Sequence, residues 1–194
     1  MKKIIAFLTL LFALTTNAFA MTATELVSNA ADQIMDQVIN PKISLKERQD
    51  HFKQIFVAHT NLRKIAKFTL GSLSKQLDDK KLKEFEEAFL HSIVVTWTER
   101  FLQYAGEKFV FTKEVVEKDT FVYSTMDVPD TEKDIDITWR VNTNKQGEMK
   151  IVDIIAEGVS MLQSYRDDYT NFLRQNNNDI DALIKKLYTR VEKK

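Results

Sequence analysis

The spacing of the apolar residues changes twice along this chain, and this change limits the folds that it can adopt. From residue 24 to about 104, apolar residues recur every three to four positions, as they do on one face of a helix. From 109 to 157 they form strand-length segments, several of them alternating with polar residues, and after 160 the helical spacing returns. Helices, then a series of strands, then helices predict an α+β fold rather than alternating βαβ units.

Four helices are expected before the strands: 24–39, one capped by Ser44, one capped by Asn61, and 79–104. Gly71 is expected to end the third helix and Gly106 the fourth. The fourth helix carries an aromatic stripe, made of Leu82, Phe85, Phe89, Ile93, Trp97, Phe101 and Tyr104. At about 100° per residue, a four-residue step drifts by roughly 40°, so this stripe winds around the helix. We therefore expect the helix to pack against a sheet on one side and helices on the other, with most of the stripe in the core. The alternative is that part of the stripe lines a cavity.

Four strands are expected at 109–117, 120–128, 134–142 and 148–157. In the third strand, Ile135, Ile137, Trp139 and Val141 alternate with polar residues, which indicates one buried face. The fourth strand is apolar on both faces and is predicted to be central. Helices at 160–174 and 179–191 complete the chain. The expected architecture is a curved antiparallel sheet of about four strands, wrapped by helices, with an apolar hollow between them.

The first twenty residues, MKKIIAFLTLLFALTTNAFA, have the three parts of a secretory signal peptide. Lys2 and Lys3 are the basic part, 4–14 the apolar part, and Ala18-Phe19-Ala20 a small-x-small cleavage site. The apolar run is shorter than the roughly 20 residues that span a bilayer. We expect cleavage after Ala20, export, and one domain over 21–194.

Composition excludes several classes of protein. Loss of the two leader lysines leaves 26 basic against 28 acidic residues, which is poor for binding nucleic acid or adhering to anionic lipid. The chain has no cysteine, so its core must stabilise it without disulfides, and a structural zinc site is disfavoured. We expect no metal site and no nucleic-acid partner.

The stretch 151-IVDIIAEGVSMLQSYRDDY-169 has the strand–Gly–Ser–helix layout of a hydrolase nucleophile elbow. However, Leu162 replaces the second glycine of that motif, and the three histidines of the chain all precede Ser160. Ser160 and Gln163 instead match an S-x-x-Q capping box at the start of a helix. We therefore expect no catalytic residue, and binding of an apolar compound by an exported protein.

Residue identities add a resemblance that covers nearly the whole mature chain. The segments 139-WRVN-142, 151-IVDIIAEGVSMLQSYRDDYTNFLRQN-176 and 180-IDALIKKL-187 closely resemble the MlaC family, also called the toluene-tolerance Ttg2 family. Its motif D-x-x-x-E-G-[IV]-S-[ML], followed by a Y-R helix, is matched in order by Asp153, Glu157, Gly158, Val159, Ser160, Met161, Tyr165 and Arg166. The chain departs from the family at Ser72-Leu73, where an aromatic or arginine pair is usual.

The resemblance implies a periplasmic phospholipid carrier with a deep apolar pocket for acyl chains and the phosphate head near solvent. It implies no cofactor other than the bound phospholipid as cargo. It also implies transfer of lipid between an outer-membrane lipoprotein complex and an inner-membrane ABC transporter with its substrate-binding MCE protein, which maintains outer-membrane lipid asymmetry. Two acyl chains expose about 30 methylenes, each costing about 0.8 kcal/mol in water, so such a pocket must offset roughly 20–25 kcal/mol.

The expected pocket residues come from the aromatic fourth helix, the third and fourth strands and the segment after them. They are Phe89, Ile93, Trp97, Phe101, Ile137, Trp139, Val152, Ile154, Val159, Met161 and Tyr165. Two alternatives remain open. One is an enzyme on a similar cone-shaped fold with Asp153 as general base, which pairing of Asp153 with Arg140 or Arg166 would disfavour. The other is a chaperone-like protein that binds apolar peptides in an open groove.

Overall fold

The computed structural model describes residues 21–102, 108–127 and 134–189, which form six α-helices and one antiparallel sheet of five strands. The helices are α1 (Ala23–Gln37), α2 (Leu45–His59), α3 (Leu62–Leu70), α4 (Asp79–Phe101), α5 (Met161–Gln175) and α6 (Ile180–Thr189), with a 3-10 turn, η1 (Gly71–Lys75). The strands are β1 (Lys108–Val116), β2 (Thr120–Asp127), β3 (Ile135–Thr143), β4 (Met149–Ala156) and β5 (Val159–Ser160). The α+β class is confirmed, and β5 is a fifth, short strand that was not expected.

Side-chain caps fix where the early helices begin. Ser44 accepts a hydrogen bond from the backbone of Glu47, whose side chain binds back to Ser44, so α2 starts with a complete capping box. Asn61 caps α3 as expected. Gly71 ends α3 with a positive φ of 57°, but the chain continues directly into η1. The expected helix ends at Gly106 and 191 lie outside the described residues.

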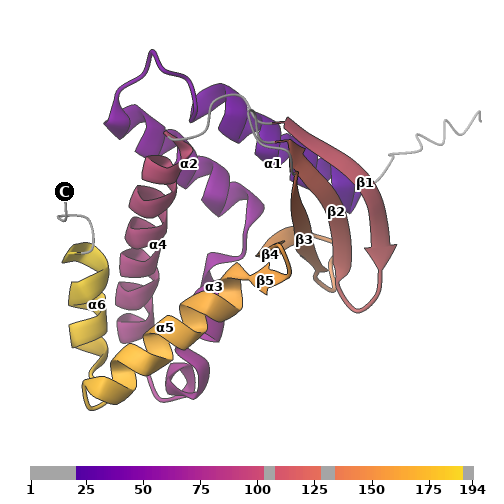
Figure 1. Cartoon of the computed structure of the whole chain (residues 1–194). Coiled ribbons are helices and arrows are strands. Elements are labelled where there is room, and N and C mark those ends of the chain that lie inside the picture. The colour runs from indigo at the N-terminus through magenta and orange to yellow at the C-terminus, as the bar shows by residue number, and fades with distance from the viewer. Residues whose placement is uncertain (1–20, 103–107, 128–133, 190–194) are drawn as a thin grey trace, which may run out of the picture.

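The sheet is an antiparallel meander in the order β1-β2-β3-β4-β5. Its strands curve around α1, which contacts β1, β2 and β4 (Figure 1). In β3 the expected alternation is confirmed, because Ile137, Trp139 and Val141 are buried and pack with residues of α1 and β2. The sheet and α1 thus share one hydrophobic core cluster.

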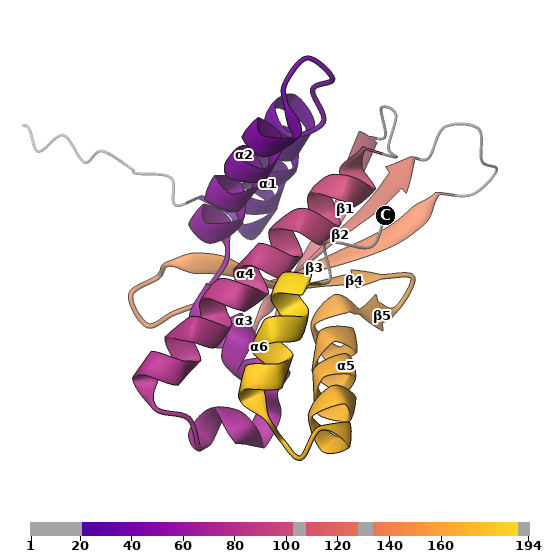
Figure 2. The same cartoon turned by 90° about the vertical axis from the view of Figure 1, so that its left-hand side faces the viewer.

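The helices α2 to α6 form a second layer with a hydrophobic core cluster of its own (Figure 2). Within it α4 packs against α2, α3 and α6, and the rings of Phe85 and Phe89 meet the ring of Tyr169 on α5 edge-on. The expectation that α4 also packs directly on the sheet is wrong, because a cavity separates the two. None of the described helices is long and apolar enough to cross a membrane.

A bulge in β4 corrects the expectation for that strand. Arg140 of β3 pairs with Asp153, but its neighbour Val141 pairs with Ile151, so Val152 is an extra residue. The bulge shifts the alternation by one, which turns Ile151 and Ile154 to the same face of the sheet. The strand is also not central, since its outer neighbour is only the two-residue β5. The bulge therefore explains why the sequence of β4 looks apolar on both faces, since alternation counted without it assigns Ile151 and Ile154 to opposite faces.

A polar network ties the β1–β2 turn to β3 and α3. The buried carboxylate of Asp119 accepts hydrogen bonds of 2.6 Å from Nε of Arg140 and from the side-chain amide of Asn142. Nζ of Lys64, on α3, donates to Oδ1 of Asn142 at 2.7 Å. Burial raises the pKa of Asp119, but the hydrogen bonds from Asn142 and Arg140 and the nearby positive charges outweigh it, so the net pKa lies below its ordinary value.

We expect Asp119→Asn to lower the free energy of unfolding by about 2 kcal/mol near pH 7, because two charge-assisted hydrogen bonds are weakened. A carboxyl whose pKa is lower in the folded state stabilises the fold above its unfolded pKa of about 3.9 and loses that contribution as the pH falls through the folded value. The difference between the variant and the original protein should therefore shrink below about pH 4.

Urea unfolding of both proteins from pH 7 to pH 3 measures this difference. Asp50→Asn is the control, since Asp50 also binds a cation, Lys46, but on the exposed surface of α2. It should leave the free energy of unfolding nearly unchanged. A difference for Asp119→Asn that stays constant down to pH 3 would contradict the predicted linkage.

Candidate functional site

A cavity of about 330 Å³ lies where the helical layer faces the sheet. Residues of α1 to α5 form one part of its wall, and residues of β1 to β4 form the other. Phe89 and Ile93 belong to the core cluster of the helices, whereas Ile137 and Trp139 belong to that of the sheet. The cavity thus occupies the junction of the two hydrophobic cores, and its lining is almost wholly apolar.

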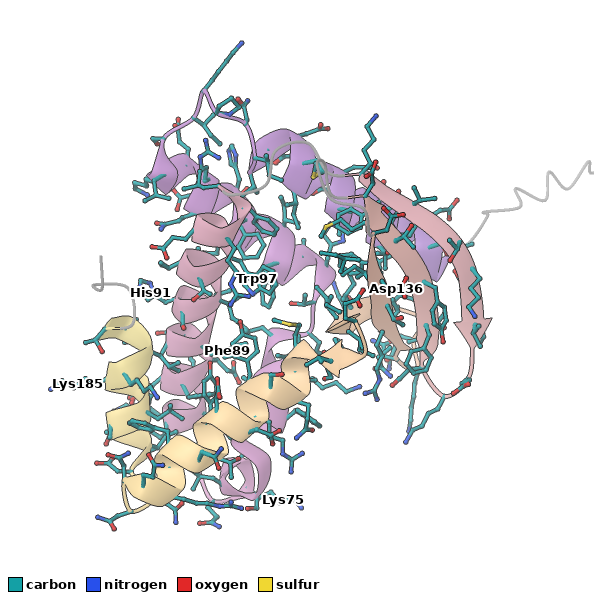
Figure 3. The ribbon with its side chains drawn as sticks, viewed as in Figure 1. Lys75, Phe89, His91, Trp97, Asp136 and Lys185 are labelled. Atoms are coloured by element: carbon teal, nitrogen blue, oxygen red, sulfur yellow. The ribbon has the colours of Figure 1, made fainter. Side chains whose placement is uncertain are left out.

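The side of α4 that faces the sheet supplies the aromatic part of the wall. Figure 3 shows Phe89 and Trp97 on this side of the helix and His91 on the opposite side, toward α6. The Phe89 side chain is 1 % exposed, and its ring meets that of Tyr165 on α5 edge-on. The rings of Trp97 and Phe101, about two and three turns further along α4, lie 5.8 Å apart between centroids. The winding aromatic stripe therefore divides into core residues such as Phe85 and cavity residues.

Ten of the eleven residues expected in the pocket line this cavity. They are Phe89, Ile93, Trp97, Phe101, Ile137, Trp139, Val152, Ile154, Met161 and Tyr165. The expectation that Val159 faces the cavity is wrong, since this residue is not part of the lining and is 58 % exposed. It lies on β5, the last strand of the sheet, where no further strand of the described chain covers it.

Sequence reasoning missed the contribution of the first two helices. The residues of α1 and α2 in the wall are Ala30, Ala31, Ile34, Met35, Phe52, Ile55 and Phe56. Their helical spacing indicated an apolar face, but spacing alone does not distinguish a face that packs in a core from one that borders a cavity. The contacts of α1 with three strands and of α2 with α1 and α4, set by the tertiary fold, bring these side chains to the cavity.

The carboxylate of Asp153 borders the cavity but is used to hold the start of α5. Its Oδ2 accepts a 2.6 Å hydrogen bond from Oγ of Ser160, and its Oδ1 accepts 2.9 Å bonds from the backbone N–H groups of Ile154 and Leu162. The side chain is 8 % exposed. Since both oxygens bind donors of the chain itself, the arrangement is that of a buried structural carboxylate.

The side chains of the two arginines considered as partners of Asp153 bind other groups, although Arg140 is its neighbour across β3 and β4. Arg140 pairs with Asp119, and the guanidinium of Arg166 lies 4.8 Å from the ring centroid of Phe68. The arginine pairing that would disfavour a general base is therefore not formed, and Asp153 is held by backbone and hydroxyl donors instead. Within the described residues, no group of three or more His, Asp or Glu side chains is placed to hold a metal ion.

Ser160 caps α5, but only half of the expected capping box forms. Oγ of Ser160 accepts a 2.9 Å hydrogen bond from the backbone N–H of Gln163. The side chain of Gln163 donates to Asp167 instead of returning to the cap. The second half is replaced by the bond from Ser160 to Asp153, which joins the cap to β4.

Glu157 and Gly158 make the sharp turn between β4 and β5. Both have positive φ, 48° and 79°, as a two-residue type I′ hairpin requires. The backbone N–H of Glu157 donates to the carbonyl of Asp136, and the backbone N–H of Asp136 donates to Oε1 of Glu157 at 2.8 Å. The turn is thereby fastened to β3. The E-G-V-S-M segment thus serves as a rigid corner at one end of the cavity wall.

Comparisons with known proteins agree with this geometry. The family model described as MlaC protein matches residues 28–189. The intermembrane phospholipid transport system binding protein MlaC of Haemophilus influenzae is 24 % identical over 95 % of this chain and 89 % of its own length. Among solved structures, the phospholipid-binding protein of Ralstonia solanacearum, in complex with a phospholipid, has a TM-score of 0.74. That likeness covers 86 % of this chain and 94 % of the Ralstonia chain at 15 % identity, and it concerns the fold.

Proposed function

The chain belongs to the MlaC protein family, and from this premise we propose that it is a transport protein that binds a phospholipid by its acyl chains in the cavity between α4 and the sheet. The residues proposed to contact the acyl chains are the ten lining residues named above, together with those of α1 and α2. The proposed function needs no reactive side chain in the site, since the cavity has only to remove the methylenes of the acyl chains from water.

The observation that carries this proposal is the position of the cavity between two hydrophobic cores. Side chains that border an unfilled apolar cavity lose the dispersion contacts that a packed core provides. An acyl chain supplies those contacts and gains about 0.8 kcal/mol for each methylene taken out of water. A cavity with such a wall therefore favours a long apolar ligand over a small polar substrate.

We further propose that the protein acts in the periplasm and passes lipid between membranes. Support comes from the leader-like segment 1–20 and from the name of the Haemophilus relative, a binding protein of an intermembrane phospholipid transport system. The proposed partners are an outer-membrane lipoprotein complex and an inner-membrane ABC transporter with its MCE protein, and the proposed outcome is outer-membrane lipid asymmetry. Residues 21–194 are proposed to act as one domain.

The proposal is tested by purifying the protein under native conditions, extracting it with organic solvent and analysing the extract by mass spectrometry. We expect near-stoichiometric phospholipid. A lipid-stripped sample should take up phospholipid again from liposomes. An extract without lipid, together with no uptake from liposomes, would refute the proposed function.

A further inference from the structure

The cavity wall contains one positively charged side chain among the described residues, that of Arg100. The other charged side chain of this lining is that of Asp153, whose two oxygens already bind Ser160, Leu162 and the Ile154 backbone. Arg100 lies in the last turn of α4 and is solvent-exposed. It therefore marks the side of the cavity that meets water.

The guanidinium of Arg100 lies over an aromatic ring. Its central carbon lies 5.2 Å from the ring centroid of Trp97, which itself lines the cavity. A cation–π contact with an indole ring favours this position of a guanidinium without using its N–H groups as hydrogen-bond donors. Within the described part of the chain, Arg100 forms no ion pair with an acidic side chain, unlike Arg63 and Arg140.

We propose that Arg100 binds the phosphodiester of the phospholipid whose acyl chains occupy the cavity, an inference that rests on the proposed function. The planar fork of an arginine matches two oxygens of a phosphate. A lipid with its chains between α4 and the sheet must place its polar head where the apolar wall ends. Arg100 and Trp97 lie on that border. Arg100 thereby makes the site prefer lipids with a phosphate over neutral lipids with the same chains.

The test compares uptake of two lipids that differ only in the head. Lipid-stripped protein is incubated with vesicles of phosphatidylglycerol and diacylglycerol with identical acyl chains, and the bound lipids are counted by native mass spectrometry. The original protein should prefer phosphatidylglycerol. In Arg100→Gln this preference should fall by about tenfold, the size of one charge-assisted hydrogen bond, while diacylglycerol uptake stays unchanged.

Arg174→Gln is the matched control. Arg174 also lies exposed in the last turn of its helix, α5, but it does not line the cavity, so this change removes the same charge elsewhere. It should keep the original preference. Equal preferences in Arg100→Gln and the original protein would overturn the inference, as would an equal loss in the two variants.

The proposed function and the role of Arg100 can fail separately in this experiment. If the original protein takes up neither lipid, the proposed function fails together with the inference, whereas uptake of both lipids without preference overturns the inference alone. Free phosphate is the second source of the same anion. Inorganic phosphate that lowers the preference at an ionic strength where chloride does not would show competition for Arg100 and support the inference, whereas a preference that chloride abolishes equally would reflect unspecific charge attraction and overturn it.

Discussion

Ile154→Glu is expected to abolish phospholipid retention, with bound lipid falling at least tenfold. Ile154 lies on β4 with its side chain in the cavity wall. A carboxylate there either stays charged against the acyl chain, at a cost of several kcal/mol, or takes up a proton at a smaller cost. A cost of about 1.4 kcal/mol already weakens binding tenfold, so either form of the side chain should lower the amount of bound lipid by at least this factor. Lipid extraction and mass spectrometry of the purified variant measure the loss.

The neighbouring residue provides the control for this change. Ile155 is half-buried like Ile154, but it points to the opposite face of β4 and is not part of the cavity wall. Ile155→Glu should therefore keep its phospholipid. Circular dichroism should show both variants folded. Full lipid occupancy in a folded Ile154→Glu protein would show that the cavity beside β4 is not where the lipid lies.

Asp153→Ala is expected to lower the free energy of unfolding by about 3 kcal/mol. The change removes the acceptor for Oγ of Ser160 and for the backbone N–H of Leu162, and both donors lie at the start of α5. A buried donor that loses its acceptor costs about 1–3 kcal/mol, and bonds to a charged group are at the upper end. The loss should appear in urea unfolding as a lower midpoint with little change in slope.

Asp168→Ala serves as the comparison for Asp153→Ala. Asp168 lies exposed on α5, so its loss should change the free energy of unfolding by no more than about 0.5 kcal/mol. A destabilisation of Asp153→Ala no larger than that of Asp168→Ala would show that the Asp153 hydrogen bonds do not hold the β4–α5 corner. It would also make Asp153 available for another role.

The cavity allows one position to combine high burial with the proposed role in lipid binding. Helices α4 and α5 on one side and the sheet on the other each complete their own core, and the cavity between them is the proposed lipid site. Residues such as Phe89 and Ile137 therefore stabilise their own layer and also face the cavity. A smaller apolar residue at such a position changes both the stability of the protein and the volume of the cavity. Introducing a charged side chain, with the same change at a neighbouring position as control, is therefore more informative.

The sequence by itself determined the elements that depend on neighbouring residues. The change in hydrophobic spacing placed the helices and four of the strands, and local capping chemistry fixed the starts at Ser44, Asn61 and Ser160. The alternation in β3 identified its buried face. The part of the cavity wall formed by α4, β3 and β4 was also largely predictable, because large apolar residues on the inner faces of an aromatic helix and a curved sheet point toward the space between them.

Only the tertiary structure decided features that depend on contacts between distant segments. The bulge at Val152 follows from the register between β3 and β4, and it changes which residues of β4 share a face. Val159 is exposed because β5 ends the sheet, and Asp153 binds the start of α5 although nothing in its local sequence selects that partner. Local spacing reports which side of an element is apolar. What lies opposite that side, whether core, cavity or solvent, is set by how the layers pack.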